Sequence, residues 1–179
     1  MDNLKQLSNK EIIELIKNKK ISAVDFINSG ICPTCFDKQN NYILYGNNKD
    51  KMIYEDDDFE CFLVGNPRSI GHTVISTKNH FKDMLEVEDE ICIKIFLLAK
   101  KTMIALKEIY NAESIYLCTM CDGPMNHFHI QLIPRYSYEK RGSKNFVKPR
   151  FVYEENKEKL IELRNKIKFS EMKKLEIDC

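Results

Sequence analysis

The residues from His127 to Arg135 have types and spacing that suit nucleophilic or metal chemistry. Alternate side chains of an extended strand share a face, so His127, His129 and Gln131 are expected to line one side. The other side would carry the residues that enter the core, Phe128, Ile130 and Leu132. Polar neighbours then stand about 6–7 Å apart, which lets a histidine nucleophile lie between a phosphate or metal ligand and an amide. The alternative interpretation is a half-buried strand whose open face carries histidines without chemical use.

This stretch resembles the signature of the histidine triad (HIT) superfamily, in which two histidines and a third histidine or glutamine alternate with apolar residues. The form with glutamine is similar to the branch that contains galactose-1-phosphate uridylyltransferase and diadenosine tetraphosphate phosphorylases. Residues 62–75, with Pro67 and the pair Gly71-His72, resemble the family's upstream hairpin. The resemblance covers residues 31–150 and is more specific for the superfamily than for the substrate.

The resemblance implies a nucleotidyl hydrolase or transferase. His129, with His127 beside it, would attack the α-phosphorus of a nucleotide, and Gln131 would stabilise the nucleotidyl-histidine intermediate. Water, phosphate or a sugar phosphate would complete the reaction. The expected substrate-binding residues are Gly123 and Asn126 in the phosphate loop, His72, and Arg135. His72 is equally well explained as a hydrogen-bonded core residue. Further basic residues that follow the signature are candidates for phosphates beyond the α position: Arg141, Lys144, Lys148 and Arg150.

Two departures from the family pattern concern substrate recognition. Many relatives carry an aspartate for the ribose hydroxyls three positions before the hairpin proline, and that position here is Val64. The segment from Asp122 to Asn126 replaces the usual Gly-Gln-Ser-Val, which predicts a differently built phosphate loop. A zinc-stabilised nucleotide sensor without turnover is therefore an alternative to the enzyme. A zinc-ribbon nucleic-acid binder is a third and weaker hypothesis.

Cys32 and Cys35 have the Cys-x-x-Cys spacing of half a tetrahedral zinc site. The resemblance to zinc-bearing relatives implies that His80 and His127 complete it, as a structural site that ties the N-terminal loop to the catalytic strand. Cys118 and Cys121 form a second pair, which leaves a four-cysteine site open. However, Cys118 lies in a predicted strand, where residues three apart point to opposite faces. A chain without bound metal is the remaining alternative.

Composition sets the broad class. The chain has 179 residues and a formal net charge of +1, so it has no general electrostatic attraction to nucleic acid or membranes. The seven cysteines are read as thiols or metal ligands, because the polar N-terminus does not resemble a signal peptide. No apolar run is long enough to span a bilayer. We expect a cytoplasmic protein.

Hydrophobic periodicity predicts an α+β fold, an antiparallel sheet covered by a long helix. Strands are expected at residues 42–45, 52–55, 60–64, 73–76, 114–120 and 127–133, and the long helix at 86–111. Capping residues Ser8 and Ser22 predict two N-terminal helices. We expect an N-terminal helical extension (1–30), a catalytic domain (31–150) and a C-terminal helix packed on it (151–179). The resemblance also implies a homodimer.

Overall fold

Short helices open the described part of the chain. The computed structural model describes residues 4–45, 48–120 and 123–172. A 3-10 helix, η1 (Leu4–Gln6), precedes α1 (Asn9–Lys17) and α2 (Ala23–Asn28). Ser8 and Glu11 exchange hydrogen bonds at the start of α1, as the sequence predicts, and Ser22 and Asp25 do so at α2. Their apolar faces form a small core of their own, made by Leu4, Ile12, Phe26 and Phe36.

Five strands form one antiparallel sheet in the order β1-β2-β3-β5-β4. The strands are β1 (Met52–Glu55), β2 (Phe59–Leu63), β3 (Thr73–Thr77), β4 (Ser114–Cys118) and β5 (His129–Arg135). Their register aligns rows of side chains across β2, β3 and β5. One row is Glu60, Ser76 and His129, and the next row on the same face is Phe62, Val74 and Gln131. The row between them, Cys61, Ile75 and Ile130, points to the other face and is buried.

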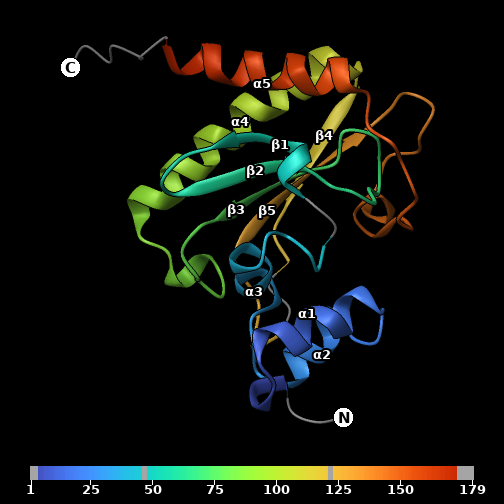
Figure 1. Cartoon of the computed structure of the whole chain (residues 1–179). Helices are drawn as coiled ribbons and strands as arrows, with labels where there is room; N and C mark the ends of the chain where they lie inside the picture. Colours follow the sequence, from blue (N-terminus) through green and yellow to red (C-terminus); the bar gives the residue numbers. More distant parts are fainter. Residues whose placement is uncertain (1–3, 46–47, 121–122, 173–179) are drawn as a thin grey trace.

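Helices α4 (Asp89–Tyr110) and α5 (Lys157–Met172) pack against each other over this apolar face (Figure 1). Their buried side chains complete the main core together with the sheet, among them Ile95, Leu98, Leu106, Leu163 and Ile167. The N-terminal helices lie at the other end of the molecule from α5 (Figure 1). The predicted α+β fold is thus confirmed. None of the helices within the described ranges is long and apolar enough to cross a membrane.

The segment from residue 33 to 45 corrects the sequence analysis. Residues 42–45 are not a strand but part of a turn that follows α3 (Pro33–Gln39), a helix that the periodicity did not reveal. The buried carboxylate of Asp37 accepts hydrogen bonds from the main-chain N–H groups of Leu44, at 2.6 Å, and Tyr45, at 3.4 Å. These contacts use the N–H groups that a strand would need, so tertiary structure overrides the β propensity of the segment.

The remaining elements are short. Three 3-10 helices are η2 (Asn48–Lys51), η3 (Met84–Glu86) and η4 (Ser143–Val147), the last within the predicted basic loop. Pro134 lies where β5 leaves the centre of the sheet, because β3 pairs with β5 only as far as Leu132. From there β5 has β4 as its only strand neighbour among the described residues. The proline therefore occupies the strand exit that its missing N–H predicts.

Candidate active site and metal cluster

A cavity of about 650 Å³ lies on the polar face of the sheet. Its floor is made of the two register rows described above, from Glu60 to His129 and from Phe62 to Gln131. Helix α3 and the turn after it line it with Thr34, Asp37, Lys38, Tyr42, Leu44 and Tyr45. At the end formed by the β2–β3 hairpin, the lining residues are Val64, Gly65, Asn66 and Arg150. The cavity is large enough for a small-molecule ligand.

A directional chain of hydrogen bonds joins the buried ring of His72 to Gln131 and His129 at this floor. The main-chain N–H of Arg68 donates to Nδ1 of His72 at 3.2 Å, so Nε2 of His72 carries the proton. That Nε2–H donates to Oε1 of Gln131 at 3.2 Å, which turns the amide nitrogen of Gln131 toward Nε2 of His129 at 3.4 Å. Nδ1–H of His129 donates to the carbonyl oxygen of His127 at 2.7 Å.

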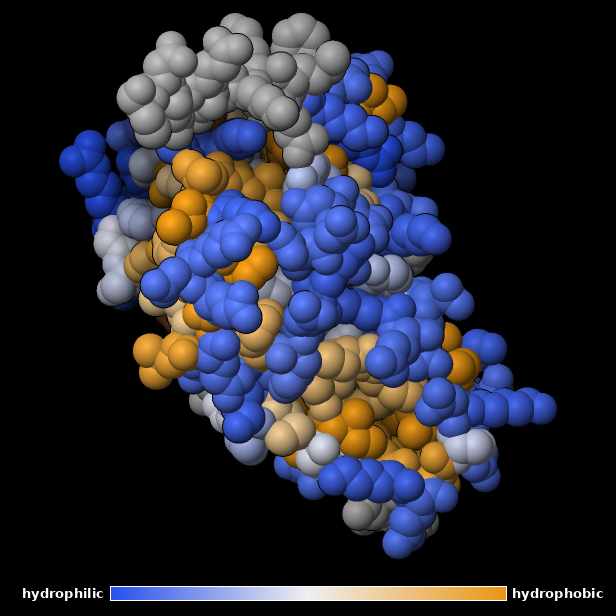
Figure 2. All heavy atoms as spheres, turned by 90° about the vertical axis from the view of Figure 1, so that its left-hand side faces the viewer, coloured by the Kyte–Doolittle hydropathy of each residue, from blue (hydrophilic) through white to orange (hydrophobic). Residues whose placement is uncertain are grey.

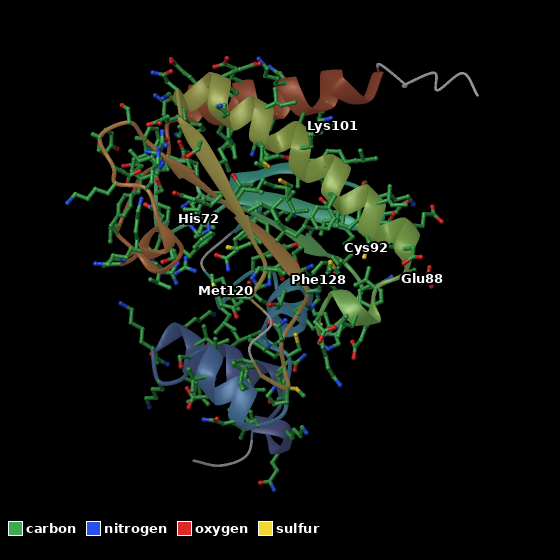
Figure 3. All side chains as sticks on the ribbon, turned by 180° about the vertical axis from the view of Figure 1, so that it is seen from behind. His72, Glu88, Cys92, Lys101, Met120 and Phe128 are labelled. Carbon is green, nitrogen blue, oxygen red and sulfur yellow. The ribbon has the colours of Figure 1, made fainter. Side chains whose placement is uncertain are left out.

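The consequence is that Nε2 of His129 keeps its lone pair and lines the cavity. Burial also lowers the pKa of His129, although its bond to the His127 carbonyl opposes this shift. Burial, with the charge of Arg150, lowers the pKa of His72 to about 4. Both imidazoles are therefore held neutral near pH 7, which is the state in which a histidine nitrogen is nucleophilic. Figure 3 labels Phe128, which directly precedes β5, and His72, which directly precedes the neighbouring strand β3.

His127 does not share the face of His129 and Gln131, because β5 begins only at His129. Its Nε2–H donates to the carbonyl oxygen of Thr77 at 2.8 Å, which leaves Nδ1 free to bind. That Nδ1 lies 3.6 Å from the sulfur of Cys32 and 3.4 Å from the sulfur of Cys35. The structure thus gives His127 two contacts: its carbonyl orients His129, and its ring faces the cysteines.

The four predicted metal ligands come together. The ligand atoms of Cys32, Cys35, His80 and His127 all lie within 4.8 Å of one another, and Nδ1 of His80 is 3.3 Å from the sulfur of Cys35. Tetrahedral zinc with its usual bond lengths sets sulfur–nitrogen separations of about 3.5 Å, so this donor set fits zinc. The hydrogen bond between the two thiols lowers the pKa of Cys32, aided by His127, and raises the pKa of Cys35, so Cys32 is the first of the pair to form the thiolate that binds metal.

A buried ionic network around Lys38 and Glu60, which the sequence analysis did not predict, lies at the other end of the cavity. Nζ of Lys38 lies 3.2 Å from the carboxylate of Glu60 and donates to the carbonyl oxygen of Thr77 at 2.7 Å. The hydroxyl of Tyr42 donates to the same carboxylate at 2.6 Å. Burial lowers the pKa of Lys38, while Glu60 opposes this shift. The position of Glu60 in its strand was readable, but its partner belongs to the helix that the sequence analysis did not find.

Other predicted residues lie away from the cavity. Arg135 is buried in an ion pair with Glu113 at 2.8 Å and donates to the carbonyl of Glu139, so its guanidinium is occupied. The Asn126 amide binds the carbonyl of Lys82, and Gly123, with a φ of +99°, has open space around it. Arg141 and Lys144 are exposed, and the thiol of Cys118 is absent from the metal cluster. Cys121 and Asp122 lie outside the described residues.

Residues 45–138 match the HIT domain. An uncharacterized HIT-like protein of Borreliella burgdorferi is 33% identical over 102 residues, which cover 51% of this chain and 73% of that protein. A hypothetical histidine triad nucleotide-binding protein of Sulfolobus tokodaii has a similar structure, with 26% identity and a TM-score of 0.52 over 67% of this chain and 82% of that one. A zinc-bound histidine triad family protein of Mycobacterium smegmatis shares the fold, with 20% identity and a TM-score of 0.55 over 69% and 87% of the two chains. Because the domain match spans more than half of its residues, the chain belongs to the HIT family.

Proposed function

We propose that the protein is a nucleotidyl hydrolase or transferase that acts on the α-phosphate of a nucleotide through a nucleotidyl-histidine intermediate. The observation that supports this most directly is the unprotonated Nε2 of His129 at the floor of the cavity, where only the amide of Gln131 contacts it among the described residues. Membership of the HIT family supports nucleotide chemistry, and the Plasmodium falciparum diadenosine triphosphate hydrolase is one protein with the same fold. The proposed activity depends on the residues of this site and not on the fold alone.

The proposed reaction has two displacements. The lone pair of His129 Nε2 forms a bond to the α-phosphorus, and the bond from phosphorus to the leaving oxygen breaks, with its electron pair going to that oxygen. An acceptor oxygen then forms a bond to the same phosphorus. The nitrogen–phosphorus bond breaks, its electron pair returns to Nε2, and the proton of the acceptor passes to solvent.

Gln131 and His72 have supporting roles in this mechanism. When Nε2 of His129 binds phosphorus, the amide of Gln131 loses its acceptor and can donate to a non-bridging phosphate oxygen instead. An amide cannot exchange protons as an imidazole does, which favours stabilisation over general-acid catalysis. His72 holds the opposite end of the same amide and is therefore a positioning residue.

We also propose a structural zinc ion at Cys32, Cys35, His80 and His127. The support is the fit of the donor set. When bound, zinc would supply a cross-link between α3 and the segment before β5. His127 would bind it through Nδ1 while its carbonyl keeps His129 in the reactive tautomer.

Turnover of a nucleotide panel by the wild type and a His129→Ala variant tests the proposal. The panel contains dinucleoside polyphosphates, nucleoside phosphoramidates and nucleotide sugars, each with and without inorganic phosphate. We expect release of a mononucleotide or nucleoside diphosphate that depends on His129, and a wild-type protein that gains the mass of one nucleotidyl group when the reaction is quenched. Glutamine at position 131 supports the phosphorylase or transferase branch. Formation of a nucleoside diphosphate that depends on inorganic phosphate would establish a phosphorylase. Nucleotide binding without turnover would refute the enzyme and leave the sensor.

We propose that two copies of the chain form a homodimer through α4. Along this helix Ile93, Phe96, Leu97 and Ile104 have exposed fractions between 44% and 61%. On the side of the molecule shown in Figure 2, hydrophobic patches lie between hydrophilic side chains. Exposed apolar side chains at helical spacing are typical of an interface. Sedimentation equilibrium tests the dimer, and an Ile104→Glu variant should shift it to the monomer.

A further inference from the structure

Two arginines fasten the C-terminal part of the catalytic region to the β2–β3 hairpin. A guanidinium nitrogen of Arg68 donates to the carbonyl of Lys148, two residues before Arg150. In return, Arg150 donates to the carbonyl of Asn66, two residues before Arg68, at 3.0 Å. A main-chain bond from Phe151 to the carbonyl of Pro67, at 3.1 Å, closes this arginine clasp. Figure 1 shows the two segments side by side, the hairpin in green and residues near 150 in orange-red.

The arginine clasp brings like charges together without a counter-charge. None of the ion pairs among the described residues includes Arg68 or Arg150. Nε of Arg68 is also buried and has no acceptor, although a buried N–H normally finds one. Burial and the charge of Arg68 both lower the pKa of Arg150. Arg68 is half-buried and Arg150 is exposed, so solvent screens part of the repulsion between them, and a bound anion would offset the rest.

The arginine clasp lies beside the proposed nucleophile. Arg150 lines the cavity together with His129 and Gln131, and its charge acts on the pKa of both His129 and His72. The acids of the cavity, Asp37 and Glu60, line its other part, where N–H groups and Lys38 already bind them. Positive potential is therefore concentrated at the hairpin end of the cavity.

We propose that Arg150, held in place by the arginine clasp with Arg68 behind it, forms a subsite for the phosphate group that is bonded to the α-phosphate of the substrate. This inference rests on the proposed function and specifies its substrate class as nucleoside polyphosphates and their dinucleoside forms. As the bond from the α-phosphorus to the bridging oxygen breaks, negative charge develops on that oxygen, and the guanidinium group of Arg150 stabilises it. Phosphoramidates and aryl esters of a nucleoside monophosphate have no phosphate at this position.

The same subsite determines the acceptor. In an in-line displacement, His129 approaches the phosphorus from one side, so the leaving group and the later acceptor both occupy the opposite side. Inorganic phosphate therefore enters the position that the leaving phosphate has vacated. It binds the guanidinium group of Arg150 in turn and yields a nucleoside diphosphate. The arginine clasp thus favours phosphorolysis over hydrolysis.

The test compares two substrates in the full chain, diadenosine tetraphosphate and adenosine 5′-phosphoramidate. Loss of one charge-assisted hydrogen bond corresponds to roughly a 10- to 100-fold loss of kcat/KM. We expect Arg150→Met to show this loss with the polyphosphate, and a loss at least ten times smaller with the phosphoramidate. Lys140→Met, which removes an exposed positive charge outside the cavity lining, should affect neither substrate. Equal losses on both substrates would show that the clasp is only structural and would overturn the subsite.

A binding measurement separates this inference from the proposed function. Calorimetric titration of the His129→Ala protein with inorganic pyrophosphate should show binding that both Arg68→Met and Arg150→Met weaken at least tenfold. Pyrophosphate affinity that neither substitution changes would overturn the subsite even if the enzyme is active. If the wild type turned over neither nucleotide, the proposed function would fail, and the titration would still decide whether the arginines bind phosphate.

Discussion

His72 should make the stability of the protein depend on pH in the mildly acidic range. Its ring is 1% exposed, accepts a hydrogen bond from Arg68 N–H and donates one to Gln131. A protonated ring would place its Nδ1–H against the N–H of Arg68. Burial therefore lowers the pKa of His72 to about 4 in the folded protein, from 6.5.

The sign and size of the effect follow from proton linkage. Between pH 6.5 and pH 4 the unfolded chain binds a proton at this position and the folded chain does not, so the free energy of unfolding falls as the pH falls. Each pKa unit corresponds to about 1.4 kcal/mol. For these two pKa values, the loss between pH 7.5 and pH 4.5 is about 2.5 kcal/mol. This is a large part of the stability of an ordinary domain.

Urea unfolding of the wild type and a His72→Gln variant, from pH 4.5 to 7.5, measures this contribution. Glutamine keeps a donor toward Gln131 but does not titrate. All other titrating groups are common to both proteins, so the difference between their free energies of unfolding reports on His72 alone. We expect the advantage of the wild type to shrink by about 2.5 kcal/mol toward pH 4.5. A difference that stays constant within about 0.5 kcal/mol would refute the claim that the buried ring is held neutral.

Two further predictions concern α3. Lys38→Met should destabilise the protein by roughly 3–5 kcal/mol in urea unfolding, because the Glu60 carboxylate would remain buried without its cation. The double variant Lys38→Met with Glu60→Leu should recover most of this loss, and a cost below about 1 kcal/mol for the single variant would contradict the buried pair. Cys35→Ser should abolish zinc binding, measured by elemental analysis, and lower Tm to the value of the chelator-treated wild type. Cys92→Ser, at a half-buried cysteine outside the cluster, is the control, and zinc retained by Cys35→Ser would rule out the site.

The sheet and the long helix were predictable because their signals are local. Alternation from His129 to Leu132 and the helical spacing of Ile91, Ile95 and Leu98 each follow from one burial pattern. The capping box at Ser8 was equally readable, because its hydrogen bonds join residues three positions apart.

The wall of the cavity was not predictable by the same means. Pro33 at the first helical position was a usable signal for α3, but the helix has only seven residues and shows little periodicity. The turn near Tyr45 depends on the Asp37 carboxylate, and the pairing of Lys38 with Glu60 depends on how α3 docks on β2. Likewise, the departure of His127 from the face of His129 results from its contact with Thr77, fifty residues away. Each of these features is decided by tertiary contacts that no local pattern encodes.

Helix α3 carries Cys35 of the metal cluster, begins directly after Cys32, and also carries Thr34, Asp37 and Lys38 of the cavity wall. A helix of seven residues is not stable in isolation, so its position depends on the groups that hold it on either side. A ligand that contacts this wall would therefore bind more tightly once the proposed zinc ion had fixed the helix. Thermodynamic reciprocity requires that the ligand raise the affinity for metal by the same factor. A cell short of zinc would then lose metal first from the copies of this protein whose cavity is empty.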